Sequence, residues 1–113
     1  PMSFFACCSR THRRYFISVP YKPRILGSAA YSFCMLARGA ACVAFEAAPK
    51  IWDIAAAWLL VSEAGGTIAP FNSELPFPIA INKDYCAMDF PTLAAASQNL
   101  YLKVYSQIQL KSP

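Results

Sequence analysis

The stretch EAAPKIWDIAAAWLLVSEAGG, residues 46–66, is the most informative part of the chain. Its run from 51 to 64 predicts a helix, because Pro49 interrupts the chain before it and Gly65–Gly66 ends it. Asp53 is expected at the start of this helix, where a carboxylate caps free backbone N–H groups and faces the positive helix end. The alanines that follow would also let a ligand approach, and a carboxylate at such a place can hold a divalent cation. Asp53 is therefore either an N-cap or a metal ligand.

Strands and helices alternate along the chain on both sides of this stretch. A second helix is expected between Ser28, a good N-cap, and Gly39, and it is so apolar that we expect it to be buried on both sides. A basic segment, residues 11–23, reads as a loop with at most one helical turn. Strands are predicted at residues 4–8, 24–26, 40–45, 67–70 and 77–81, the last at a sheet edge, and a third helix at 91–110. Alternation of this kind predicts one layered α/β domain over residues 1–113 with a mostly buried sheet.

The composition is that of a folded domain with an unusually apolar surface. Of the 113 residues, 57% are hydrophobic and 14% are charged, which excludes a disordered chain. The longest apolar run, Ile54 to Val61, is far shorter than the ~20 residues that span a membrane, so no membrane partner is expected. A domain this small cannot bury all of its apolar residues, so we expect part of its surface to meet another domain or another chain.

The charged and sulfur-containing residues exclude several classes of function. The net charge is +4, and Arg10, His12, Arg13 and Arg14 cluster near the start of the chain. This charge is mild for a nucleic-acid module, so we interpret the cluster as a solvated or phosphate-facing loop and keep nucleic-acid binding only as a remote alternative. The five cysteines are odd in number and contain no CxxC pair, which favours free thiols in a reducing, cytoplasmic compartment over a disulfide scaffold. A zinc site built from Cys7, Cys8 and His12 is the less favoured alternative.

Three motifs, correctly ordered and spaced, resemble those of the inositol monophosphatase family. WDIAAAWLLVSEAGG, residues 52–66, matches every fixed position of the family signature W-D-x-A-[AG]-x(3)-[IVL]-x-x-E-A-G-G. RILGSAA, residues 24–30, resembles its R-x-x-G-[ST]-A-A element, and ARG, residues 37–39, resembles its A-x-G turn. The resemblance implies the C-terminal half of a layered α/β/α/β/α sandwich of the sugar phosphatase type.

The same resemblance implies a chemistry and a set of site residues. Members of the family hydrolyse small phosphate monoesters with Mg²⁺ and are inhibited by lithium. Asp53 would be a metal ligand, and Glu46 would hydrogen-bond substrate hydroxyls. Gly27, Ser28 and Ala29 would line the substrate pocket through their backbone groups and the Ser28 hydroxyl. For each of these residues a purely structural role, such as a solvated charge for Glu46 or a helix cap for Ser28, remains the alternative.

Two further signature residues are expected to be structural. Trp52 would contribute packing, and Glu63 would hold the turn at Gly65–Gly66. Neither is expected to touch substrate or metal.

The chain lacks other parts of the family pattern. It contains no G-E-E element and no D-P-x-D-G element, which carry the family's main metal ligands. Because one aspartate cannot hold Mg²⁺, we expect these 113 residues to be inactive alone. The expected partner is the missing N-terminal half of the same protein, since Pro1 is not an encoded start; a homodimer would also cover an apolar surface. The alternative function is a non-catalytic domain of the same fold that binds a sugar phosphate or another protein.

Overall fold

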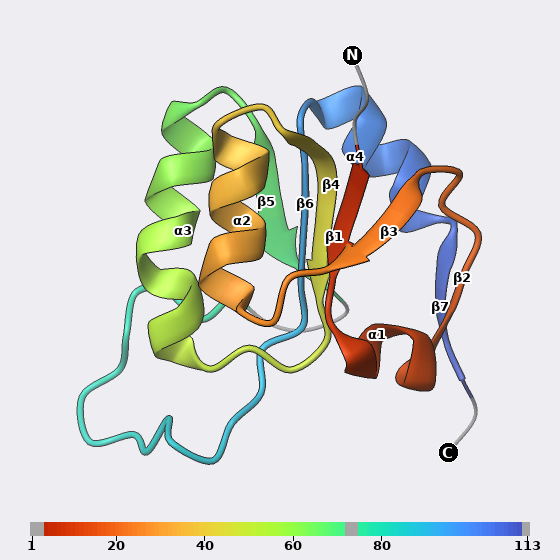
Figure 1. Cartoon of the computed structure of the whole chain (residues 1–113). Helices are drawn as coiled ribbons and strands as arrows, with labels where there is room; N and C mark the ends of the chain where they lie inside the picture. Colours follow the sequence, from red (N-terminus) through yellow and green to blue (C-terminus); the bar gives the residue numbers. More distant parts are fainter. Residues whose placement is uncertain (1–3, 72–74, 112–113) are drawn as a thin grey trace.

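The computed structural model describes residues 4–71 and 75–111, which form a five-stranded sheet flanked by helices (Figure 1). The strand order is β3-β1-β4-β6-β5, in which β1 is parallel to β3 and β4, and β6 is antiparallel to β4 and β5. The strands are β1 (Phe4–Cys7), β3 (Lys22–Ile25), β4 (Ala41–Glu46), β5 (Thr67–Pro70) and β6 (Thr92–Ala95). The carboxyl ends of β3, β1 and β4 therefore meet at one edge of the sheet.

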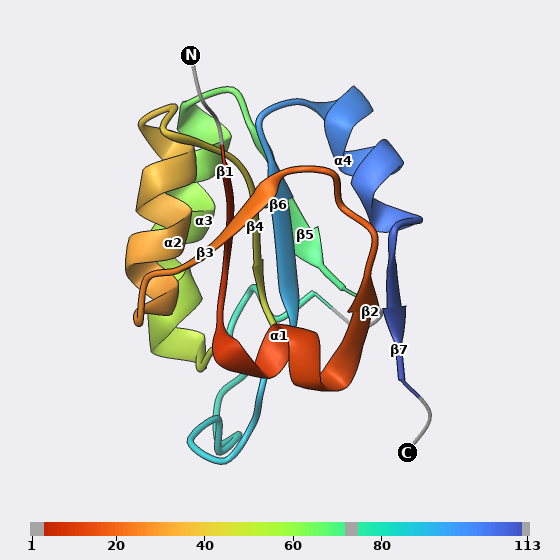
Figure 2. The same ribbon diagram turned by 45° about the vertical axis from the view of Figure 1, so that its right-hand side comes forward.

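The two faces of the sheet are covered differently (Figure 2). Helices α2 (Ala29–Ala37) and α3 (Ile51–Glu63) lie together on one face. On the other face lie helix α4 (Gln98–Tyr105) and a small antiparallel pair, β2 (Tyr15–Ile17) with β7 (Ile108–Leu110). Helix α1 (Ser9–Arg14) runs across the carboxyl end of β1. The layered α/β class predicted from the sequence is confirmed.

Alternation along β4 divides the core between the two faces. Val43 and Phe45 point into the cluster under α4, where the Phe45 ring lies 4.9 Å from that of Tyr15. Ala44 points to the α2–α3 face and packs with Ile54. By the same period of two, Glu46 at the end of β4 belongs to the α2–α3 face. The sheet alternation thus places a carboxylate beneath two helices.

The motif glycines and Ser28 have local structural reasons. Ser28 caps α2, since its Oγ accepts the backbone N–H of Tyr31 at 3.3 Å. Gly39 and Gly65 end α2 and α3 in left-handed conformations, with φ of 87° and 88°. Gly66 has no room for a side chain, because a Cβ there would lie 3.0 Å from both the Ala95 carbonyl oxygen and Val61 Cγ1. The double glycine of the signature therefore ends α3 and lets the chain pass close to β6.

The predicted helix at 91–110 is wrong at both ends, since α4 ends at Tyr105 and residues 108–110 form β7. Residues 92–95 form β6, which is fully buried between β4 and β5, and the helix starts only after Ser97, whose Oγ accepts the N–H of Leu100 at 3.2 Å. An alanine-rich run has a helical preference, but sheet pairing decides its conformation here. The predicted edge strand at 77–81 is also wrong. Those residues lie in the long connection from β5 to β6, where Pro78 follows a cis peptide bond.

The basic segment, residues 11–23, contains more regular structure than expected. It includes most of α1, all of β2 and the start of β3. Strand β2 pairs with β7 near the other end of the chain, so local sequence does not reveal it.

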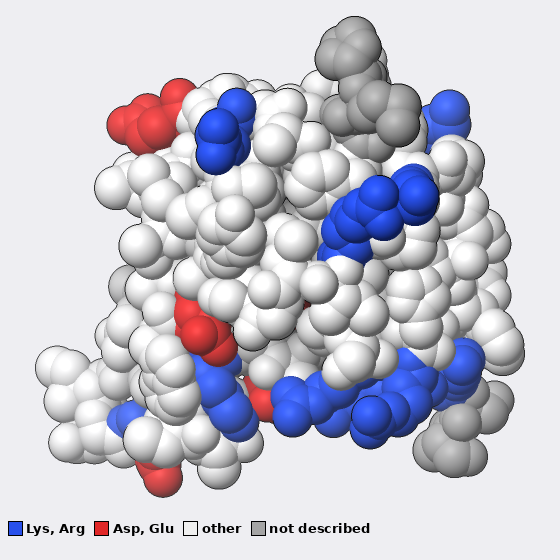
Figure 3. Space-filling view, viewed as in Figure 1, with Lys and Arg blue, Asp and Glu red and all other residues white. Residues whose placement is uncertain are grey.

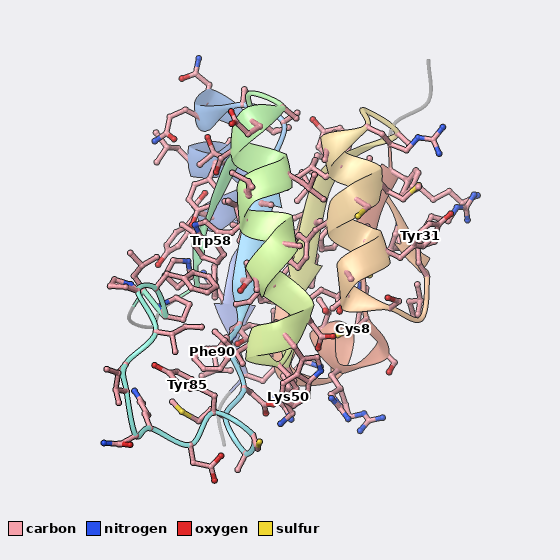
Figure 4. The ribbon with its side chains drawn as sticks, turned by 90° about the vertical axis from the view of Figure 1, so that its left-hand side faces the viewer. Cys8, Tyr31, Lys50, Trp58, Tyr85 and Phe90 are labelled. Atoms are coloured by element: carbon pink, nitrogen blue, oxygen red, sulfur yellow. The ribbon has the colours of Figure 1, made fainter. Side chains whose placement is uncertain are left out.

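The outer faces of α2 and α3 are exposed and apolar. Tyr31 on α2 is 49% exposed, which corrects the expectation that this helix is buried on both sides, and its side chain points away from α3 (Figure 4). On α3, Trp52, Leu59 and Leu60 are exposed by 60%, 64% and 46%. Trp52 therefore does not pack as predicted. Glu63 is also exposed, and its side chain makes no hydrogen bond within the described segments, so it does not hold the glycine turn.

Helices long and apolar enough to cross a membrane do not occur among residues 4–71 and 75–111.

Candidate functional site

A cavity of about 280 Å³ opens at the edge of the sheet where the three parallel strands end. Residues at or after the end of each of these strands line the cavity, and the start of α3 lines another side of it. Ligands commonly bind in α/β proteins at such a carboxyl edge. The lining residues are Cys8, Ser9 and Arg10 after β1; Ile25, Gly27, Ser28 and Ala29 around the end of β3; Glu46, Ala48 and Pro49 at the end of β4; and Asp53 on α3.

The structure places all five site residues named from the sequence in this one cavity. Gly27, Ser28 and Ala29 form its wall at the start of α2, and Glu46 and Asp53 contribute its two carboxylates. The sequence did not point to Cys8 and Ser9, and it pointed to Arg10 only as part of a basic cluster in a solvated or phosphate-facing loop. The available signal was the predicted strand at 4–8, because a strand parallel to its neighbours delivers the residues that follow it to the same edge.

Glu46 is a buried carboxyl group at the cavity. It is 5% exposed, and this burial raises its pKa above the ordinary value. Hydrogen bonding with the side chains of Ser32 and Cys8 offsets the rise in part, while the negative charge of Asp53 adds to it. A buried carboxyl group held in this way can donate a hydrogen bond to a ligand hydroxyl group when it is protonated, and can accept one when it is ionised.

Asp53 has a structural partner and an open oxygen. Helix α3 begins at Ile51 with Lys50 as its N-cap, so Asp53 occupies the third helical position and the expected N-cap placement is wrong. Its Oδ2 accepts the backbone N–H of Lys50 at 2.8 Å, as in one half of a capping box. No described residue hydrogen-bonds to Oδ1. Asp53 can therefore stabilise the helix start with one oxygen and bind a cation with the other.

The residues present fit a magnesium site only in part. In the two described segments, no three His, Cys, Asp or Glu residues come together in a way that could hold a metal ion. Magnesium prefers oxygen ligands in octahedral geometry and binds through carboxylates, waters and substrate phosphates. The free oxygen of Asp53 is a ligand of this kind. The remaining protein ligands of such a site would have to come from outside the described residues.

The helix starts and nearby charges favour an anionic ligand at this edge. Helices α2 and α3 both begin at the cavity, and the positive end of a helix attracts phosphate. Figure 3 shows a band of Lys and Arg along the same lower edge, over α1. Within it, Asp89 pairs with Lys50 at 3.0 Å and with Arg14 at 3.9 Å. Figure 4 shows Cys8 and Lys50 at the lower ends of the two helices, on this side of the molecule.

The chain is similar to proteins of one family. The model of the inositol monophosphatase family matches residues 2–110. Inositol monophosphatase 1 of Xenopus laevis is 30% identical over 87 residues, which are 77% of this chain and 27% of that protein. Nus factor SuhB of Pasteurella multocida is 49% identical over 49 residues, which are 43% of this chain and 18% of that protein.

Two solved structures show the same fold at low sequence identity. An inositol monophosphatase from Anabaena superposes with a TM-score of 0.63 at 19% identity and covers 94% of this chain and 42% of its own. A Pyrococcus horikoshii protein described as similar to inositol-1 monophosphatase gives 0.67 at 18% identity and covers 96% and 44%. The chain spans less than half the length of these relatives. With the family model matched over residues 2–110, the chain belongs to the inositol monophosphatase family.

Proposed function

We propose that the chain forms one wall of the active site of a Mg²⁺-dependent phosphatase that hydrolyses small phosphate monoesters, such as an inositol phosphate or a related sugar or nucleotide phosphate. The observation that carries the proposal is that Gly27, Ser28, Ala29, Glu46 and Asp53, which come from separate segments of the chain, line a single cavity. Membership of the family supports a phosphatase. A structural relative described as an inositol monophosphatase and NADP phosphatase was solved with Mg²⁺ and phosphate.

In this proposal the residues of the chain bind and orient the substrate. The buried Glu46 carboxyl hydrogen-bonds a hydroxyl of the sugar or cyclitol ring, and its rigid burial fixes the ring. The backbone of residues 27–29 lies against the ring, and the start of α2 faces the anion. Asp53 contributes one oxygen to the metal. Bound magnesium supplies an activated water and neutralises phosphate charge.

The remaining metal ligands are proposed to come from an N-terminal half that packs on the outer faces of α2 and α3. Those faces expose Tyr31, Trp52, Leu59 and Leu60, and exposed apolar faces of this kind often mark protein–protein contact sites. The chain alone is therefore proposed to be inactive, and a homodimer through the same surface is the alternative partner. We also propose a cytoplasmic location, with which the lack of a disulfide bond among the described cysteines is compatible.

A second candidate is a non-catalytic domain that binds a sugar phosphate or a protein through the same fold. It is favoured by the lack of a three-residue metal cluster in the described segments. Some relatives are also named as a Nus factor, not as a phosphatase.

The test is phosphate release by the complete gene product from a panel of inositol, sugar and nucleotide monophosphates. We expect turnover that requires Mg²⁺, stops with a chelator and is inhibited by lithium, and no turnover by residues 1–113 alone. A complete gene product that binds these compounds and releases no phosphate from any of them would establish the non-catalytic alternative.

A further inference from the structure

Ser32 is a fully buried polar residue on α2, beside the candidate site. It lies outside the three sequence motifs and is not among the residues that line the cavity. The other buried residues of this helix, Phe33, Met35 and Leu36, are apolar. A serine inside a helix gains little by itself, because its hydroxyl group competes with the backbone for hydrogen bonds. Its contacts therefore need an explanation.

The partners of Ser32 are two groups of the candidate site. Its Oγ donates to the carbonyl oxygen of Ser28, about one helical turn earlier, at 3.2 Å. Its side chain also hydrogen-bonds with the carboxyl group of Glu46. Ser28 and Glu46 both line the cavity and belong to different segments of the chain. One buried hydroxyl group thus joins two walls of the cavity.

The Ser32 hydroxyl group can hold the Glu46 carboxyl group whether or not that group is ionised. A hydroxyl oxygen donates one hydrogen and accepts others. While Ser32 donates to the Ser28 carbonyl, its oxygen can accept a hydrogen bond from a protonated carboxyl group. When the carboxyl group is ionised, the hydroxyl hydrogen can turn toward it, and the Ser28 carbonyl still accepts the backbone N–H of Ser32 at 3.0 Å.

The backbones that carry these side chains are fixed by regular structure. Glu46 is the last residue of β4, which pairs with β1 and β6. Ser32 lies in the first half of α2, whose start is capped by Ser28. What remains to be fixed is the orientation of the Glu46 side chain, and Ser32 and Cys8 are its hydrogen-bonding partners. A side chain that is already ordered loses less conformational entropy when a ligand binds.

We propose that Ser32 is a positioning residue, which holds the Glu46 carboxyl group in the orientation that binds a ring hydroxyl group of the substrate. This proposal rests on the proposed phosphatase function and adds to it the residue on which the ring contact depends. Ser32 itself does not touch the substrate. Because the ring is bound in both the ground state and the transition state, losing this support raises KM and leaves kcat nearly unchanged.

The test is a double-mutant cycle in the complete gene product, with myo-inositol 1-phosphate or the monophosphate of the panel that it hydrolyses fastest. Ser32→Ala should raise KM by about tenfold, the size typical of a hydrogen bond to a charged group, and change kcat by about twofold or less. Glu46→Met occupies similar space without a hydrogen-bonding group. In that background Ser32→Ala should change kcat/KM by about twofold or less. Equal losses in both backgrounds, or a Ser32→Ala variant with wild-type KM, would overturn the proposal.

Two further variants separate positioning from a general effect on stability. Ser106→Ala is the control, because the Ser106 Oγ also donates to a backbone carbonyl, that of Lys103 at 2.9 Å, but at the end of α4 on the other face of the sheet (Figure 2). It should keep the wild-type KM. Ser32→Thr keeps the hydroxyl group and should recover most of the affinity. Urea unfolding is measured for each variant. KM values that follow the free energy of unfolding, and not the presence of a hydroxyl group at position 32, would overturn the proposal.

NMR and calorimetry separate failure of this proposal from failure of the phosphatase function. The carboxyl carbon resonance of Glu46 is the one that Glu46→Met removes, and it is recorded without substrate or metal. Ser32→Ala should shift it at constant pH, whereas Ser106→Ala should not; an unshifted resonance in Ser32→Ala would overturn the proposal whatever the activity.

If the complete gene product releases no phosphate, the phosphatase function fails, and binding of myo-inositol 1-phosphate is titrated instead. An affinity that Ser32→Ala lowers by about tenfold would still support the positioning role. Equal affinities of wild type and Ser32→Ala, or no binding by the wild type, would overturn it.

Discussion

The Asp53 carboxylate accepts the backbone N–H of Lys50 at 2.8 Å and also lines the cavity at the carboxyl ends of β1, β3 and β4. One side chain thus joins the start of α3 to the candidate site. The hydrogen bond orients Asp53, and its other oxygen makes no hydrogen bond to the described residues. Stabilising the start of α3 from the third helical position is therefore compatible with a role as a metal ligand.

The capping role predicts how the stability responds to substitution. Asp53→Ala removes the acceptor and should lower the free energy of unfolding by about 1 kcal/mol. Asp53→Asn keeps an oxygen at the same place and should change it by about 0.5 kcal/mol or less. Urea unfolding of the two variants checks this. Equal losses would show that the hydrogen bond to Lys50 does not stabilise the helix.

Burial of Glu46 predicts a dependence of stability on pH. Because its pKa is raised in the folded state, folding favours the protonated form, and this contribution to stability is present below the unfolded pKa and lost as pH rises through the folded pKa. Glu46→Gln does not ionise, so its melting temperature relative to wild type should rise between about pH 4 and pH 8. A difference that is constant over this range would contradict the burial cost. The same variant should also bind substrate more weakly, and this loss of affinity is measured separately from the change in melting temperature.

Close packing at Gly66 predicts a loss of stability for Gly66→Ala. The added Cβ would contact backbone at Ala95 and the Val61 side chain, both at 3.0 Å, so we expect a loss of about 1–3 kcal/mol. In a Val61→Ala background the added loss should be smaller, because one of the two contacts is removed. Denaturant unfolding of the four proteins measures this coupling, and additive losses would exclude the contact with Val61.

The exposed face of α3 predicts self-association of residues 1–113 when they are produced alone. Leu59 and Leu60 are exposed by 64% and 46%, and replacing both with serine should shift size-exclusion elution toward the monomer. Replacing Leu102, which is 59% exposed on α4, is the control and should have no such effect. A wild-type chain that elutes as a clean monomer would favour the non-catalytic, self-sufficient domain.

The sequence predicted those elements whose ends carry strong local signals. Ser28 and Gly39 bound α2, and Gly65 ends α3, close to the predicted limits. It failed at β6, where an alanine-rich run becomes a strand only because β4 and β5 pair with it on both sides. It also missed β2, whose partner lies near the other end of the chain.

The candidate site was also predicted only in part, because some of its residues are brought together by contacts between distant parts of the chain. Glu46, Asp53 and residues 27–29 were named from motifs, and the structure shows that they share a cavity. Arg10 belongs to no motif. It reaches the cavity because β1 lies between β3 and β4, and strand order depends on distant contacts that a single sequence does not display.

The proposed role of Asp53 as a metal ligand of a phosphatase predicts how turnover by Asp53→Asn in the complete gene product depends on Mg²⁺. The variant should fold normally, and its turnover at limiting Mg²⁺ should fall by about 100-fold or more, since a metal ion supplies several kcal/mol of transition-state stabilisation. Raising the Mg²⁺ concentration should restore part of the loss. Wild-type turnover of a normally folded Asp53→Asn variant at limiting Mg²⁺ would contradict the assignment.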